Sequence, residues 1–271
     1  MRYRIGRRGV LAVYAVLIVV PLLVVFTGTF KTQSELFSSP FGLPSSFDPG
    51  NYHTVLTERN LGRAFLNSTL VIIFSVPITL FLASLAAYAI ARIPGWKSWA
   101  IFTFLVLGLA VPAQANMIPQ YVLFQNLGLL NSLTGLVIIN IVVTLPVSVF
   151  ILTGFMKTLP REIYDASSID GAGPWNTYRR IALPLSMPSV AATAIFLFVI
   201  HWNDLLYPLL FIQEPSKKTL PVALLDFTGE FLTDYPMLFT GVVIASVPLV
   251  LAYLFMQRWF ISGMTSGSVK G

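Results

Sequence analysis

The sequence has no cysteine, and only 10% of its 271 residues are charged. The absence of cysteine excludes disulfides, thiolate chemistry and cysteine-based metal sites. Histidine is almost as scarce, because His53 and His201 are the only two, too few for a usual zinc site. No Gly-x-x-x-x-Gly-Lys-Ser/Thr phosphate-binding loop occurs, so the chain is not expected to hydrolyse ATP alone. No catalytic residue and no metal site are predicted.

Long apolar runs are what the sequence has instead. Hydrophobic residues make up 56% of the chain, and the mean hydropathy is +0.78. Several runs reach the roughly 20 residues that a helix needs to cross the hydrocarbon core of a bilayer. The sequence therefore predicts an all-α membrane protein with six transmembrane helices. Their approximate ranges are 10–30, 66–91, 98–118, 133–156, 188–212 and 239–260.

The basic residues indicate an orientation for these helices. If the N-terminus is cytoplasmic, twelve of the 17 Lys and Arg residues lie on the cytoplasmic side. An excess of Lys and Arg marks cytoplasmic loops, so both termini are predicted to be cytoplasmic. Residues 31–63 then form an external loop, in which Pro40, Pro44 and Pro49 predict little regular structure. Because the charges flank apolar runs, the net charge of +6 is not taken as a sign of nucleic-acid binding.

Proline recurs at membrane depth. Each such proline removes a backbone donor and can kink a helix. Ordinary kinking and a hinge function are both compatible with this pattern. The positions are Pro21, Pro77, Pro112, Pro146, Pro208 and Pro248.

A polar segment, residues 157–184, separates the fourth and fifth predicted spans. Thr158 is expected to cap a helix whose first turn contains Pro160, where a missing N–H costs nothing. Gly171 is expected to adopt the left-handed conformation that ends a helix. These signals predict a short helix at about 160–170.

A second short helix is predicted from Pro174 to about Ile181. Two interpretations of the whole segment are compatible with each other. It can lie at the lipid headgroups, where Trp175 and Tyr178 suit the interface. It can also be a docking surface, since long punctuated loops often carry function.

The residues Glu162-Ile-Tyr-Asp-Ala-Ser-Ser-Ile-Asp-Gly-Ala172, followed by Ile181-Ala-Leu-Pro184, resemble the EAA loop of ABC-importer permease subunits. The sequence departs from that pattern at Asp165, where Glu is usual, and at Ser167, where Ala is usual. The C-terminal residues 263–271 and the motif His201-Trp-Asn-Asp204 are similar to those of the carbohydrate-uptake permeases of the MalG type.

This resemblance implies the type I importer permease fold in a bacterial or archaeal plasma membrane. Residues 1–65 would form the first helix and an external loop, 66–260 the permease core, and 261–271 a cytoplasmic tail. The chain would form half of the translocation pathway for a sugar or related solute. Its implied partners, besides the lipid bilayer, are a second, MalF-like permease, a homodimeric ATPase and an extracytoplasmic solute-binding protein. ATP and magnesium would bind to the ATPase, and this chain would be no enzyme and bind no cofactor.

The resemblance also implies roles for particular residues. The residues that would couple to the ATPase are Glu162, Asp165, Ala166, Asp170, Gly171 and Ala172. Those expected near a tip that contacts the binding protein are Thr228, Gly229 and Glu230.

Polar residues in the fifth predicted span are candidates for the pathway: His201, Asn203 and Asp204. His201 and Asp204 are three residues apart and are expected to share a helix face. A structural contact between helices, a lining of the pathway and a proton relay are all open roles for them. A self-sufficient secondary transporter and a membrane scaffold remain alternative functions for the chain.

Overall fold

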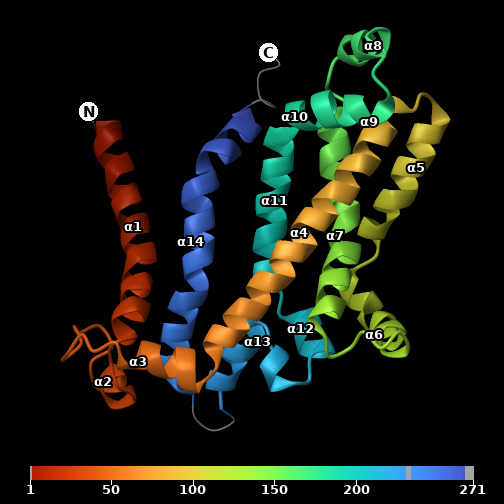
Figure 1. Cartoon of the computed structure of the whole chain (residues 1–271). Coiled ribbons are helices and arrows are strands. Elements are labelled where there is room, and N and C mark those ends of the chain that lie inside the picture. Colours follow the sequence, from red (N-terminus) through yellow and green to blue (C-terminus); the bar gives the residue numbers. More distant parts are fainter. Residues whose placement is uncertain (1, 230–232, 266–271) are drawn as a thin grey trace. The chain divides into compact units, whose positions relative to one another are not determined.

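The computed structural model describes the backbone of residues 2–229 and 233–265 and the side chains of residues 7–229 and 233–255 (Figure 1). The described residues form helices joined by loops, with one isolated bridge between Thr228 and Thr233 and no strand. The prediction of an all-α chain is confirmed.

Four helices are long and apolar enough to cross a membrane: α1 (Arg2–Gly28), α4 (Leu61–Arg92), α7 (Leu133–Met156) and α14 (Tyr235–Thr265). They correspond to the spans predicted near 10–30, 66–91, 133–156 and 239–260. Each has one proline in its interior and continues through it as a helix. Proline inside these helices therefore does not end them.

The third predicted span, 98–118, is wrong as a single straight helix. The chain forms α5 (Trp96–Val106) and the 3-10 turn η2 (Leu107–Ala110), then η3 (Ala113–Asn116) and α6 (Met117–Asn126). The two halves meet at an angle of 86°. Val111 is extended (φ −97°, ψ 119°), because a residue before proline, here Pro112, is driven out of the helical region.

The fifth predicted span, 188–212, is also interrupted. Helix α11 (Met187–Trp202) ends before Asn203, and the short helix α12 (Leu206–Phe211) follows. The prediction that His201 and Asp204 share a helix face is therefore wrong, since Asp204 lies beyond the helix end. Two pairs of helical segments are sharply bent, Trp96–Ala110 with Ala113–Asn126 and Pro174–Leu185 with Met187–Trp202, and counting each pair as one span gives up to six spans in the described chain.

The chain divides into two compact units. Unit 1 comprises Met1–Leu66 and Thr219–Leu249. Its short elements are α2 (Gln33–Ser38), α3 (Gly50–His53), the π-helical turn η1 (Thr54–Glu58), α13 (Leu220–Leu224) and the 3-10 turn η6 (Leu225–Phe227). The predicted external loop 31–63 thus has more regular structure than its prolines indicate.

A buried lysine holds the first part of that region together. The Lys31 ammonium donates hydrogen bonds to the carbonyl oxygens of Ser39 at 2.8 Å and Gly42 at 2.7 Å. Lys31 is only 1% exposed, so these carbonyls replace the water that its charge has lost.

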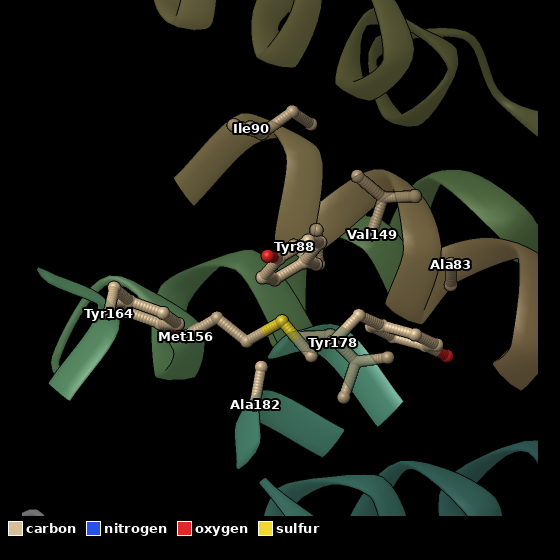
Figure 2. Close-up of a cluster of buried hydrophobic side chains, with 10 residues drawn as sticks. Ala83, Tyr88, Ile90, Val149, Met156, Tyr164, Tyr178 and Ala182 are labelled. Carbon is tan, nitrogen blue, oxygen red and sulfur yellow. The ribbon is translucent and has the colours of Figure 1, made fainter. Parts of the chain in front are cut away.

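Unit 2 comprises Asn67–Lys218 and Val250–Gly271, and α7 packs against α5, α11 and α12 within it. Two apolar clusters lie along α7. One includes Phe124, Leu136, Ile139 and Phe211. The other contains Tyr88, Val149, Met156, Tyr164 and Tyr178 (Figure 2). The second cluster positions the polar segment described next.

Candidate functional site

The polar segment forms a nine-residue helix, α8 (Arg161–Ile169), just beyond the end of α7 (Figure 1). This confirms the helix predicted at about 160–170. One of its sides is buried through Tyr164 and Ser167, each 3% exposed. The opposite side carries exposed residues at the i, i+3, i+4, i+7 positions of a helix. They are Glu162, Asp165, Ala166 and Ile169.

Ile169 is the residue that sequence reasoning missed. It is 86% exposed, although an isoleucine on a short amphipathic helix is expected to face the core. Its spacing of seven residues from Glu162 is the signal that would have placed it on the outward side. The outward side therefore combines two carboxylates, a small residue and an apolar residue.

Helix α8 ends as the sequence predicts. Gly171 has φ +73°, and its N–H donates to the Ser168 carbonyl at 3.1 Å. The Ala172 N–H donates to the Ser167 carbonyl at 3.0 Å. This pair of bonds is the Schellman motif, with Asp170 as the last capping residue.

The beginning of α8 differs from the prediction. The Thr158 hydroxyl donates to the Phe155 carbonyl at 2.7 Å, so it closes the end of α7 and does not cap α8. Pro160 occupies the N-cap position itself and makes no side-chain capping bond. The first N–H groups of α8 are therefore left without a side-chain acceptor from the cap.

The buried side of α8 is fixed to the end of α4. The Tyr164 ring lies 6.3 Å from the Tyr88 ring, and the Arg92 guanidinium lies 4.8 Å above the Tyr164 ring centroid. The Tyr164 phenol oxygen is buried and has no hydrogen-bond partner in the described residues. Burial raises the pKa of this phenol, Tyr88 raises the pKa further, and Arg92 opposes the shift.

A second helical piece braces α8. It begins with α9 (Pro174–Thr177), as predicted, and continues through the π-helical turn η4 (Tyr178–Ala182) and α10 (Leu183–Leu185). It extends beyond the predicted end at Ile181, and the chain turns by 73° before α11.

Hydrogen bonds between side chains lock these pieces together. The hydroxyls of Ser167 and Thr177 lie 2.7 Å apart and join α8 to α9. The hydroxyls of Tyr178 and Ser84 lie 2.8 Å apart and join η4 to α4. The unusual serine at position 167 thus has a partner that an alanine would lack.

His201 lies in α11 and joins three helices. Its Nδ1 is 2.9 Å from the Ser75 hydroxyl of α4, and its Nε2 is 3.3 Å from the Thr144 hydroxyl of α7. Since Thr144 donates its proton to the Asn140 carbonyl at 2.6 Å, it accepts from His201, which assigns the ring proton to Nε2. This geometry provides an interhelical contact.

The other two pathway candidates interact locally. The Asn203 amide donates to the Val199 carbonyl at 2.8 Å. An Asp204 carboxylate oxygen accepts the Tyr207 N–H at 3.4 Å, at the beginning of α12. Among the described residues, no three His, Asp or Glu side chains are grouped as a metal ion would require.

The residues predicted to contact a binding protein lie in unit 1. Thr228 and Gly229 are exposed, and the Thr228 hydroxyl donates to the Leu225 carbonyl at 2.7 Å. Glu230 lies outside the described residues.

Long apolar helices and two bent helix pairs are the features of a polytopic membrane protein. The chain belongs to the family described as the inner membrane component of binding-protein-dependent transport systems, which its residues 75–266 match. The predicted resemblance to ABC-importer permeases is thereby confirmed. A self-sufficient secondary transporter is not favoured.

Curated relatives match nearly the whole chain. The diacetylchitobiose uptake permease NgcG of Streptomyces coelicolor is 32% identical, covering 99% of this chain and 90% of its own. The multiple sugar-binding transport permease MsmG of Streptococcus mutans is 33% identical, covering 96% and 95%. A chain of a solved bacterial ABC transporter that imports alginate superimposes with a TM-score of 0.85 at 18% identity, covering 95% of this chain and 96% of its own. That similarity shows a shared fold.

Proposed function

We propose that this chain is half of the translocation pathway of an ATP-driven importer for a sugar or related solute. Membership of the family supports a binding-protein-dependent transport system, and the names of NgcG and MsmG support a sugar as the solute. The proposal includes a second permease as the other half, a homodimeric ATPase that binds ATP and magnesium, and a solute-binding protein outside a bacterial or archaeal plasma membrane. This chain itself would bind no cofactor and carry out no catalysis.

The proposal includes six spans with both termini cytoplasmic. Four long helices and two bent pairs support that number. Residues 1–65 form the first helix with an external loop, 66–260 the permease core, and 261–271 the tail. Basic residues support the orientation, since Arg92 and Lys157 end or follow α4 and α7 on the side where α8 lies.

Helix α8 is the element that we assign to the ATPase. The observation that carries this assignment is its two-sided character: one side is exposed while the other is buried against α4 and braced by α9. Ala166 permits close approach, and the carboxylates of Glu162 and Asp165 can pair with basic groups of a partner. Asp170, Gly171 and Ala172 end the helix and hold its direction.

Movement of the ATPase would then reach the membrane helices through packed side chains. Tyr164 transmits it to Tyr88 and Arg92 at the end of α4. Tyr178 transmits it to Ser84, which precedes Tyr88 in the same helix. Helix α8 and the turn η4 contact α4 at these two places, and the Ser167–Thr177 hydrogen bond links α8 to the helical piece that contains η4. The two can therefore pull on α4 as one body, because packed side chains deform little.

Cysteine cross-linking tests the assignment of α8. In the assembled importer, Ala166→Cys is expected to cross-link to the ATPase and to lower ATP hydrolysis stimulated by the binding protein. Gln125→Cys is the control, since Gln125 is exposed on α6 in the same unit. Figure 1 shows α6 at the end of α7 that is away from α8. It lies beyond the opposite end of α7, whose 24 residues span about 36 Å.

Two results would contradict this function. Equal cross-linking at Ala166 and Gln125 would remove α8 as the docking element. Solute transport by this chain alone in liposomes, without ATP, would remove the importer itself.

The contact with the binding protein is tested separately. Thr228 and Gly229 are exposed, as such a contact requires, and Glu230 is proposed with them from the sequence. Charged substitutions at Thr228 and Gly229 are expected to lower stimulated ATP hydrolysis while leaving basal hydrolysis unchanged. Unchanged stimulation would remove these residues from the contact.

His201, Asn203 and Asp204 are proposed to border the pathway while His201 also holds three helices together. Substitutions at Asn203 are expected to change the solute preference of uptake without lowering thermal stability, because among the described residues its side chain bonds only within its own turn. Unaltered preference would leave these residues with a structural role.

A further inference from the structure

A pocket of about 550 Å³ lies beside the first turn of α8, within unit 2. Its walls are the end of α4 with the loop that follows it, the start of α5, the end of α7 and the start of α8. Of the four residues on the outward side of α8, Asp165 alone is among those that line the pocket. No role described so far uses this pocket.

The charge of the lining is mainly positive. Arg92, Lys157 and Arg161 line the pocket, against the single carboxylate of Asp165. In the part of the chain whose side chains are described, none of these three basic groups forms an ion pair with a carboxylate. Two of them lie over aromatic rings instead. Arg92 lies 4.8 Å from the centre of the Tyr164 ring, and Lys157 lies 5.1 Å from the centre of the Phe102 ring of α5.

Two helices also begin at this pocket. Helix α5 begins after Gly95, and α8 begins after Pro160, and neither has a side-chain cap. Gly95 lines the pocket, as do Leu159 and Arg161 on either side of Pro160. The free N–H groups and the dipole of a helix N-terminus both favour a bound anion. Two such termini therefore surround one space together with three basic side chains that have no carboxylate partner in the described residues.

The position of the pocket relative to the apolar helices narrows the kind of anion. Helices α4 and α7 are of spanning length, and they end at Arg92 and Met156, which both line the pocket. The pocket thus lies where these helices leave the hydrocarbon, at the depth of lipid phosphates and of the basic residues that contact them.

We propose that this pocket binds a phosphate group, supplied by the headgroup of an anionic phospholipid or by a free phosphate compound. The bound phosphate would hold the first turn of α8 against the ends of α4 and α7. The proposal depends neither on the transported solute nor on docking of the ATPase.

Native mass spectrometry tests it on the assembled importer in nanodiscs of phosphatidylcholine with and without phosphatidylglycerol. Wild type is expected to retain phosphatidylglycerol in preference to phosphatidylcholine. The double substitution Lys157→Gln with Arg161→Gln is expected to weaken retention by about tenfold for each charged contact removed. Arg179→Gln with Arg180→Gln is the matched control. These substitutions remove the same charge, and the two arginines are exposed and do not line the pocket.

A second arm separates the two sources of phosphate. Nanodiscs of phosphatidylcholine alone are titrated with inorganic phosphate and glycerol 3-phosphate, and amide exchange of residues 157–165 is followed. Protection by these compounds, without retention of phosphatidylglycerol, would assign the pocket to a free phosphate. Lys157→Arg with Arg161→Lys keeps both charges and is expected to bind as wild type does, which separates loss of binding from misfolding.

Three results would overturn the proposal. The first is a preference for phosphatidylglycerol in wild type that both glutamine variants keep to the same extent. The second is neither lipid preference nor protection by phosphate in wild type. The third is binding by the permease pair that disappears in the assembled importer, which would show that the ATPase fills the pocket.

Discussion

Gly171→Ala examines how the end of α8 is held. Gly171 has φ +73°, a left-handed conformation that costs an L-residue with a Cβ about 1–2 kcal/mol. No heavy atom lies within 4 Å of where that Cβ would stand, so steric contact adds nothing to this cost. The bonds from Gly171 and Ala172 to the last carbonyls of α8 depend on the left-handed residue. Gly171→Ala should therefore weaken α8 by about 1–2 kcal/mol.

Gly173→Ala is a matched control two residues along the chain. Gly173 also has no heavy atom within 4 Å of an added Cβ, but its φ is −68°. An alanine adopts that conformation without strain, and it lowers the entropy of the unfolded chain. The two variants add the same methyl group to the same loop and differ in backbone conformation.

Amide hydrogen exchange of residues 161–172 in the reconstituted importer measures the difference. A loss of 1–2 kcal/mol corresponds to about 5–30-fold faster exchange through local opening. Gly171→Ala should show this acceleration together with lower stimulated ATP hydrolysis, and Gly173→Ala should show neither. Gly171→Asn should be intermediate, since Asn tolerates the left-handed region. Equal exchange in the two alanine variants would refute the reasoning.

The remaining predictions concern three buried polar side chains. Tyr164→Phe should leave thermal stability near neutral pH unchanged, because the phenol has no hydrogen-bond partner among the described residues, whereas Tyr164→Ala should cost about 3–5 kcal/mol. Folding raises the pKa of this phenol, so its contribution to the free energy of unfolding is present below pH about 10 and is lost at higher pH. Between about pH 9 and about pH 11, thermal unfolding should therefore show wild type losing stability relative to Tyr164→Phe. Tyr178→Phe removes the bond to Ser84 and should cost about 1 kcal/mol in denaturation and lower stimulated ATP hydrolysis, while Tyr88→Phe, in the same cluster, should preserve that bond and the hydrolysis. His201→Ala should lower thermal stability by about 1 kcal/mol or more through two lost interhelical bonds while ATP-driven uptake persists; unchanged stability would contradict the contact.

The short helix in the polar segment could be predicted because its signals are local. Gly171 is followed by a residue that can complete the Schellman motif, and Glu162 suits a first turn. The prediction that Thr158 caps α8 was wrong because a threonine can also bond the last carbonyls of the preceding helix. Its hydroxyl donates to the Phe155 carbonyl of α7. A capping residue between two helices can serve either one, and sequence alone does not decide.

The breaks in the third and fifth predicted spans could not be read from hydropathy. Pro112 ends a helical run, while Pro77 and Pro146 lie inside continuous helices. The same residue type thus gives both outcomes, and packing by neighbouring helices decides between them. In the fifth span Asn203 and Asp204 follow Trp202 at the helix end, but apolar residues resume at Leu205, so the mean hydropathy of the span stays high and hides the break.

The contacts of His201 were also beyond the sequence. Ser75 and Thr144 are far from it along the chain and meet it through the packing of α4, α7 and α11. Periodicity identifies the buried side of one helix, but it does not identify which hydroxyl of another helix lies opposite.

The π-helical turn η4 sets the rotation of α9, and through the Ser167–Thr177 bond that of α8, relative to α11. A π-helical turn contains an additional residue relative to an α-helix, and each residue of an α-helix turns the chain by about 100°. Deleting one residue between Tyr178 and Ala182 would keep a helix of nearly the same length. It would also rotate Thr177 away from Ser167 and turn the outward side of α8 toward a different direction. An aligned sequence that is one residue shorter here is therefore expected to carry its outward carboxylates one position away along α8.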